Sequence, residues 1–572
     1  MKRRTVKRAT VVAGKRARDS TAELLLRCES ENIAPPYVVD PGTYREQTWS
    51  ILRQSLPLPT KPVPLKSHGD DIFIVSDLHL ASGRDDAGVY RGTENFFADD
   101  SFGRFLEHAL HIKKTPGASL VINGDVFDFL RVTEYPGKVS PPRLVRRIRR
   151  ALKRLPAEPG QTRTGRALVE GAFEEWSAEL GRVGVVRTAA ELEAAITARE
   201  RRYGLGTEDF KAVYKMMLIR KGHPAFFRAL SSWVARGHRL IIFKGNHDLE
   251  WFWPAVRNYF RLLIADGIAG SGGGAGLYDV LRDLVLPAIT FIDDAAVIDD
   301  LFYLEHGHRY DRFAMVLDSP VLASAPRQLS IPFGSFFNRY LINRIELYYP
   351  FMDNLTPATN ILPVMMRENF PLALRILFQH VPLLVRVLFT RFRYVWFMLH
   401  GVVWLILALL APVITALIAA PGLLSGIAGS VGSPAPSGIA GFFVTLAKNA
   451  GLLILSYLLA RVVAWYQLEE PSSLETYAAA RRAGTPFTIM TMGHTHVPAE
   501  ARIHGECRFY NTGTWIPVIE TSSAAIREDR TYTFLHVTRD PTGGLAVAGG
   551  NLLQRWNDDA LRAEPLAVIG RK

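Results

Sequence analysis

The feature that most constrains this chain is a unit that recurs five times: a short apolar run that ends in Asp, His or Asn. The runs occupy 72–75, 120–122, 240–243, 301–304 and 488–492. Apolar runs of this length, bounded by Gly or Asp, are typical of buried strands. Because each polar group follows its run, we expect these groups at the carboxyl ends of strands, where open α/β sheets place their sites.

Helical patterns between the runs, such as 102–111 and 224–236, predict an α/β fold in which strands alternate with helices. The chain has 572 residues, enough for two or three domains. We expect a basic, partly disordered N-terminal arm at 1–66, catalytic parts at 67–130, 223–315 and 481–572, a basic helical insertion at 131–222 and a hydrophobic helical insertion at 316–480.

Charge and cysteine content narrow the partners and the compartment. The formal net charge is +13, which favours phosphates, nucleic acid or an acidic membrane surface. The basic residues before position 20 lack the apolar run of a secretory signal and predict a basic arm, or simply a solvated tail. Cys28 and Cys507 match no disulfide framework, so we expect a reducing compartment.

Two apolar stretches lie inside the insertion at 316–480. Residues 394–420 are long enough to span a bilayer, whereas 438–466 contains Lys448, Asn449 and Arg461 and fits a span less well. Arginines flank both stretches, which predicts that both flanks lie in the cytoplasm. A membrane-associated hairpin is therefore expected, which either spans the bilayer or is re-entrant or interfacial. A buried hairpin, a hydrophobic lid and a dimerisation surface are the alternatives.

The polar residues after the runs form a set with metal-binding chemistry. Carboxylate, imidazole and amide ligands together suit two divalent ions such as Mn, Fe, Zn or Mg better than soft metals. In an extended segment, the side chains of an Asp-x-His or His-x-His pair point the same way. The candidate metal ligands are Asp77, His79, Asp125, Asn246, His306, His494 and His496.

These motifs resemble the calcineurin-like metallophosphoesterase superfamily, whose signature is Asp-x-His, Gly-Asp-x-x-Asp, Gly-Asn-His-Asp, His and Gly-His-x-His. The resemblance covers about 71–130, 223–312 and 484–538. It implies a four-layer sandwich of two mixed β-sheets flanked by helices. It also implies one ion on Asp77, His79, Asp125 and His496, and a second on Asp125, Asn246, His306 and His494.

The same resemblance implies roles for the residues around the ligands. His247 would protonate or orient the leaving oxygen, and Asp248 would fix its imidazole ring. Asp128 and Asp311 would support ligands and loops by hydrogen bonds rather than bind an ion. His308 would either contact the substrate or pack as an ordinary buried histidine.

The expected reaction is hydrolysis of a phosphoester or diphosphate through a metal-activated hydroxide. The motif wording is nearest to the UDP-diacylglucosamine pyrophosphatase branch, although that branch commonly has Arg where His247 stands and Asp where His308 stands. Phe129-Leu130 and Lys244 replace residues typical of the phosphoprotein phosphatases. We expect a lipid- or nucleotide-linked substrate at the cytoplasmic membrane surface, with a nuclease or nucleotide phosphodiesterase as the alternative. A non-catalytic scaffold is less favoured, because no ligand is missing.

Overall fold

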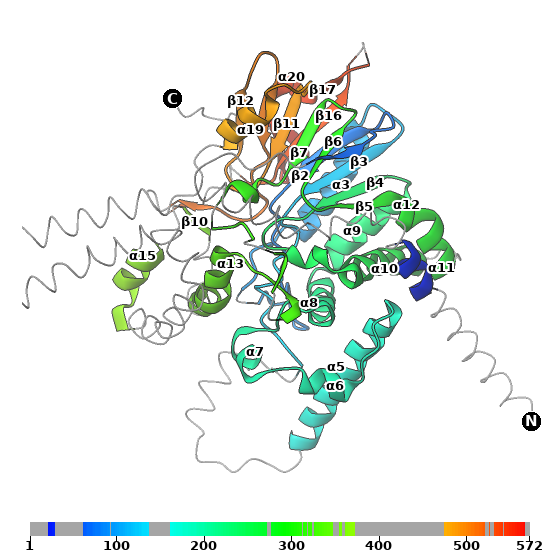
Figure 1. The fold of residues 1–572 in the computed structure, drawn as a ribbon, viewed down its shortest axis with the longest axis vertical. Coiled ribbons are helices and arrows are strands. Elements are labelled where there is room, and N and C mark those ends of the chain that lie inside the picture. Colours follow the sequence, from blue (N-terminus) through cyan, green and yellow to red (C-terminus); the bar gives the residue numbers. More distant parts are fainter. Residues whose placement is uncertain are drawn as a thin grey trace, which may run out of the picture. The chain divides into compact units, whose positions relative to one another are not determined.

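A computed structural model of the chain provides the fold (Figure 1). It divides into two compact units, one of Met1–Asn354, Ser473–Ile519 and Ala525–Lys572, the other of Leu355–Ser472 and Glu520–Ala524. The structure describes residues 21–28, 61–91, 93–136, 161–271, 276–311, 313–316, 319–322, 325–346, 354–356, 361–371, 474–520, 525–526, 531–540 and 543–566.

The larger sheet of the first unit is mixed. Its strands β2 to β5 are parallel to one another, and β16 is antiparallel to β2. The order is β19 (Arg562–Pro565), β18 (Gln554–Asn557), β16 (Thr533–Arg539), β2 (Asp71–Val75), β3 (Ala118–Asn123), β4 (Arg239–Phe243) and β5 (Ile289–Ile292), with β17 (Leu545–Val547) also paired to β16.

The smaller sheet is also mixed, because β7, β11 and β13 are parallel, whereas β6 is antiparallel to β7 and β12 is antiparallel to β13. β6 is parallel to its other neighbour, β1. The order is β1 (Val63–Leu65), β6 (Ala295–Ile298), β7 (Phe302–Glu305), β11 (Ile489–Met492), β13 (Arg508–Asn511) and β12 (Ala499–Arg502). All five apolar runs of the sequence therefore form strands, three in the larger sheet and two in the smaller one.

The two sheets share an apolar layer. Ile72 and Ile74 of β2 pack there with Leu304 and Ile489 of the smaller sheet. The alternate residue of β2, Phe73, packs instead into the larger cluster that includes the helices. Successive strand residues point to opposite faces, so a strand that is buried on both faces appears in the sequence as an unbroken apolar run.

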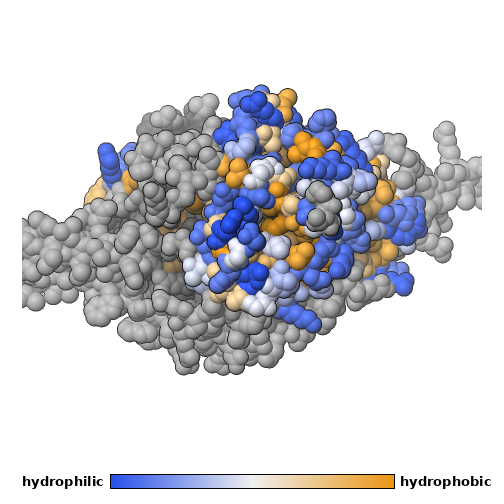
Figure 2. Space-filling view, turned by 90° about the horizontal axis from the view of Figure 1, so that it is seen from above, coloured by the Kyte–Doolittle hydropathy of each residue, from blue (hydrophilic) through white to orange (hydrophobic). Residues whose placement is uncertain are grey.

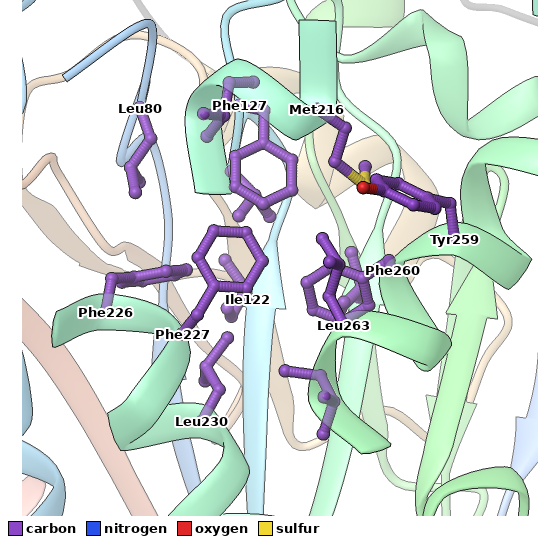
Figure 3. Packing of buried hydrophobic residues seen from close by; sticks show 14 of the residues in the cluster. Leu80, Ile122, Phe127, Met216, Phe226, Phe227, Leu230, Tyr259, Phe260 and Leu263 are labelled. Carbon is purple, nitrogen blue, oxygen red and sulfur yellow. The ribbon is translucent and has the colours of Figure 1, made fainter. Parts of the chain in front are cut away.

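Helices cover the outer faces of the sheets. The larger sheet is covered by α8 (Asp209–Gly222), α9 (Pro224–Ala235) and α10 (Pro254–Gly270). Their residues Met216, Phe227 and Phe260 pack in one cluster with Ile122 of β3 and with Phe127, which follows β3 (Figure 3). α3 (Asp99–Ile112) contributes to the same cluster. On the smaller sheet, α19 (Leu474–Arg482) buries its apolar residues against β11. The predicted pair of mixed sheets flanked by helices is confirmed.

The described parts of the two insertions are largely helical. The first contains α5 (Gln161–Arg182), α6 (Ala189–Ala194), α7 (Ala198–Tyr203) and α8, and Thr188 and Thr197 begin two of these helices with capping boxes. The second contains β8 (Val321–Leu322), β9 (Ala325–Leu329), α13 (Phe333–Phe337), the π-helix η4 (Asn338–Ile342), α14 (Asn343–Glu346) and α15 (Ile361–Glu368).

The predicted membrane hairpin stays a prediction, because 394–420 and 438–466 lie outside the described residues. Among the helices that the structure does describe, none has the length and apolar character needed to cross a bilayer. Figure 2 shows hydrophilic residues interspersed with smaller hydrophobic areas on the described part of one face.

Candidate metal centre

Five loops carry the candidate ligands, and each loop begins where a strand ends. Asp77 and Asp125 follow β2 and β3, which are neighbours in the larger sheet, and Asn246 follows β4. His306 and His494 follow β7 and β11, which are neighbours in the smaller sheet. The carboxyl ends of both sheets thus supply the centre, in keeping with the usual place of sites in α/β folds.

The first group of ligand atoms comes from the loops that follow β2 and β11. His79 Nε2 lies 2.9 Å from His496 Nε2, and Asp77 Oδ1 lies 3.4 Å from His496 Nε2 and 3.8 Å from His79 Nε2. Metal–ligand bonds of roughly 2.0 to 2.2 Å leave neighbouring ligand atoms roughly 3 to 3.5 Å apart. The three side chains can therefore hold one ion.

The second group lies beside the first. Asp125, His306 and His494 bring their ligand atoms within 4.8 Å of one another. Asp125 Oδ2 is 3.1 Å from His306 Nε2 and 3.8 Å from His79 Nε2, so it faces both groups. The other oxygen of Asp125 accepts a hydrogen bond of 2.8 Å from the His247 backbone N–H. Asp125 is thus placed where a carboxylate can bridge two ions.

Two buried oxygens show that this donor set fits cations. Asp77 Oδ1 and Asn246 Oδ1 are shielded from solvent, yet within the described part of the chain neither accepts a hydrogen bond. Burial raises the pKa of Asp77, but the His306, His496 and His79 imidazoles outweigh it and hold that pKa well below its usual range. Buried oxygens of this kind need a partner, and a divalent ion supplies one.

The backbone of these loops differs from the sequence-based expectation. Asp-x-His and His-x-His were expected in extended conformation, but the ligands themselves have positive φ angles. Such angles cost a residue with a side chain about 1 kcal/mol or more and concentrate at functional sites. The left-handed ligand residues are Asp77 (55°), His79 (52°), Asp125 (52°), His494 (71°) and His496 (56°). The chain turns sharply at each of these five ligands rather than running on as a strand.

Three motif glycines make room for ligands from other motifs. A Cβ atom on Gly124 would lie 2.3 Å from His306 Nδ1, and one on Gly245 would lie 2.0 Å from Asp125 Oδ1. A Cβ on Gly493 would lie 2.6 Å from Asp77 Oδ2. The glycines of the Gly-Asp, Gly-Asn-His and Gly-His motifs are therefore required by close packing between loops.

The partner of His247 is Asp128, which corrects the assignment of that role to Asp248. His247 Nδ1 lies 2.8 Å from Asp128 Oδ2, and a carboxylate can only accept there, so Nδ1 carries the proton. The oxygens of Asp248 instead accept from the backbone N–H groups of Gly245 (2.6 Å) and Val126 (2.8 Å). Burial and the Asp125 carboxylate raise the pKa of Asp248 to about 7. Asp248 ties two ligand loops together.

The remaining predicted residues also lie at the centre. Asp311 Oδ2 is 3.2 Å from His494 Nε2, and its Oδ1 accepts from the Phe313 backbone N–H. His308 is buried beside His306, with ring centroids 5.4 Å apart, and its Nδ1 has no hydrogen-bond partner in the described part of the chain. Burial, followed by His306 and His494, lowers the pKa of His308 well below its usual range. A neutral imidazole at this position can accept a hydrogen bond or bind a metal ion.

The sequence did not single out Arg131 or Glu346, which form a fully buried ion pair behind Asp128. Their separation of 215 positions leaves no local signal in the sequence.

Comparisons with known family models, with curated proteins and with solved structures found no match to this chain. Its function is therefore argued from the site.

Proposed function

We propose that this protein hydrolyses a phosphoester or diphosphate bond with two divalent metal ions, as a member of the calcineurin-like metallophosphoesterase superfamily. One observation carries the proposal. Side chains from five separate loops meet at one place. Two buried oxygens of the candidate ligands, Asp77 Oδ1 and Asn246 Oδ1, form no hydrogen bond within the described residues. A structural role would leave those oxygens unsatisfied.

In this proposal, two bound ions supply the chemistry of a two-metal centre, which holds phosphate oxygens and yields a nucleophile from water near neutral pH. One ion would bind Asp77, His79 and His496, the other Asn246, His306 and His494. Asp125 would join both, because its Oδ2 faces His79 and His306. The metal could be Mn, Fe, Zn or Mg.

His247 would act as the general acid. Its side chain is 15% exposed, whereas Asp128 is fully buried behind it. The Nδ1 proton is directed to Asp128, which fixes the tautomer and leaves Nε2 to give a proton to the leaving oxygen. The buried carboxylate also favours the protonated ring that such a step needs.

We further propose a lipid- or nucleotide-linked substrate and a place at the cytoplasmic membrane surface. The support is the sequence alone, from the apolar stretches at 394–420 and 438–466 and the net charge of +13. Hydrolysis of DNA or RNA with a steep salt dependence would favour the nuclease alternative instead.

The proposal is tested by hydrolysis of bis-p-nitrophenyl phosphate and p-nitrophenyl phosphate by the full chain in detergent with manganese. Asp125→Ala should lose both bound metal and activity, whereas Asp283→Asn should keep both, because Asp283 forms an exposed ion pair with Arg282. Metal-loaded wild-type protein that hydrolyses neither ester, no lipid phosphate and no nucleic acid would instead be a scaffold.

A further inference from the structure

The proposed general acid, His247, lies at the outer end of a row of buried charged side chains. Behind His247 stands Asp128, whose Oδ2 is also 3.7 Å from Arg131 Nε. The Arg131 guanidinium in turn forms an ion pair with Glu346. The side chains of Asp128, Arg131 and Glu346 are each only 1% exposed. Charges buried so completely are stabilised by one another rather than by water.

The charges of Asp128, Arg131 and Glu346 alternate in sign along this row. Glu346 and Asp128 are acidic, and the Arg131 guanidinium lies between them. Loss of the Glu346 charge would remove the acid paired with the Arg131 guanidinium, while Asp128 would remain 3.7 Å from Arg131 Nε. Asp128 would then be drawn toward the guanidinium and away from the imidazole.

Hydrogen bonds to the backbone also hold Asp128 and α14 (Asn343–Glu346) in place. Asp128 Oδ1 accepts from the backbone N–H groups of Leu130 (3.2 Å) and Arg131 (3.1 Å). Asn343 Nδ2 donates to the Leu130 carbonyl over 2.8 Å, which binds α14 to this turn. Glu346, the last residue of α14, is therefore held against Arg131 by a second contact from the same helix.

We propose that Arg131 and Glu346 are positioning residues for the reaction, which hold Asp128 and through it aim His247 at the leaving oxygen. This inference rests on the proposed function. It adds that a helix from the second insertion, α14, takes part in proton delivery. Arg131 and Glu346 would not touch the substrate, so their replacement would lower turnover with little effect on metal binding or on KM.

Dependence on the leaving group separates positioning from a general structural effect. A nitrophenolate leaves with little help from an acid, whereas the more basic phenolate needs a proton in the transition state. Glu346→Gln should therefore lower kcat for phenyl phosphate by about tenfold or more. For p-nitrophenyl phosphate, kcat should fall by only about twofold. The control is Glu200→Gln. Glu200 is a buried carboxylate in the first insertion, 2.6 Å from Lys211 Nζ. Its replacement should leave the ratio of kcat on the two esters unchanged.

The second test is a double-mutant cycle with His247→Asn. If Glu346 acts through His247, Glu346→Gln should have no further effect in that background, whereas additive losses would overturn the proposal. An equal loss on both esters, or no loss, would also overturn it. If Glu346→Gln does not fold, Arg131→Lys must show the same selective loss or the proposal fails. Metal-loaded wild-type protein inactive on both esters, on lipid phosphates and on nucleic acid would overturn the proposed function itself.

Discussion

Replacement of Gly245 by alanine tests whether close packing between loops builds the metal centre. The new Cβ would lie 2.0 Å from Asp125 Oδ1 and 2.6 Å from the Asp125 backbone nitrogen. Ordinary contacts begin at 3.4 Å, so the carboxylate would have to move by about 1.4 Å. Metal sites tolerate deviations of only about 0.2 Å in ligand distance. Asp125 would therefore lose its place between the two ions.

We expect Gly245→Ala to bind at most one of two divalent ions per chain and to lose about 100-fold or more in kcat/KM, since a misplaced reacting group costs on that order. Metal content by plasma emission spectrometry and ester hydrolysis measure the two effects, and circular dichroism checks the fold. Gly171→Ala is the control, because a Cβ there meets nothing within 4 Å. Gly245→Ala protein with both ions and wild-type turnover would refute the steric argument.

Three further predictions concern the acid, the ions and a buried histidine. His247→Asn should keep both ions but lose about 10² to 10⁴-fold in kcat on poor leaving groups; parallel metal loss would instead make it a ligand. Removal of metal by a chelator should abolish hydrolysis and lower Tm, and added Mn should restore both; activity that survives complete removal would exclude a metal mechanism. Against the effect of burial, Glu94 and Asp99 raise the pKa of His223 to about 9, so its stabilisation should be complete below pH 6.5 and lost as pH rises through about 9. In chemical denaturation, the advantage of wild type over His223→Gln should be about 3 kcal/mol at low pH and shrink over that window, and a constant difference would contradict the assignment.

The strands could be predicted because each is buried on both faces. The runs before Asp77, Asp125 and Asn246 became β2, β3 and β4, since an unbroken apolar run with a polar end has few other places in an α/β fold. The polar ends then met at one edge of the sheets. Local pattern and overall topology gave the same answer for these residues.

Other features depend on contacts between distant residues, which no local pattern encodes. Asp128 and Asp248 are equally plausible partners for His247 in the sequence, and only the fold shows that Asp128 reaches it across 119 positions. The positive φ of Asp77 (55°) was likewise not predicted, because an Asp-x-His pair after an apolar run resembles the continuation of a strand. The pairing of Arg131 with Glu346 was not predictable for the same reason.

The ligands are spread along the chain in a way that matters for its synthesis. Asp77 and His496 are separated by 418 residues of the sequence. A growing chain released after β7 could bring Asp125 to His306 but would lack both histidines that follow β11. A complete pair of the proposed ions would thus report that synthesis has passed β11 and that both sheets have joined, and chains that stop before β11 would lack the proposed hydrolytic activity.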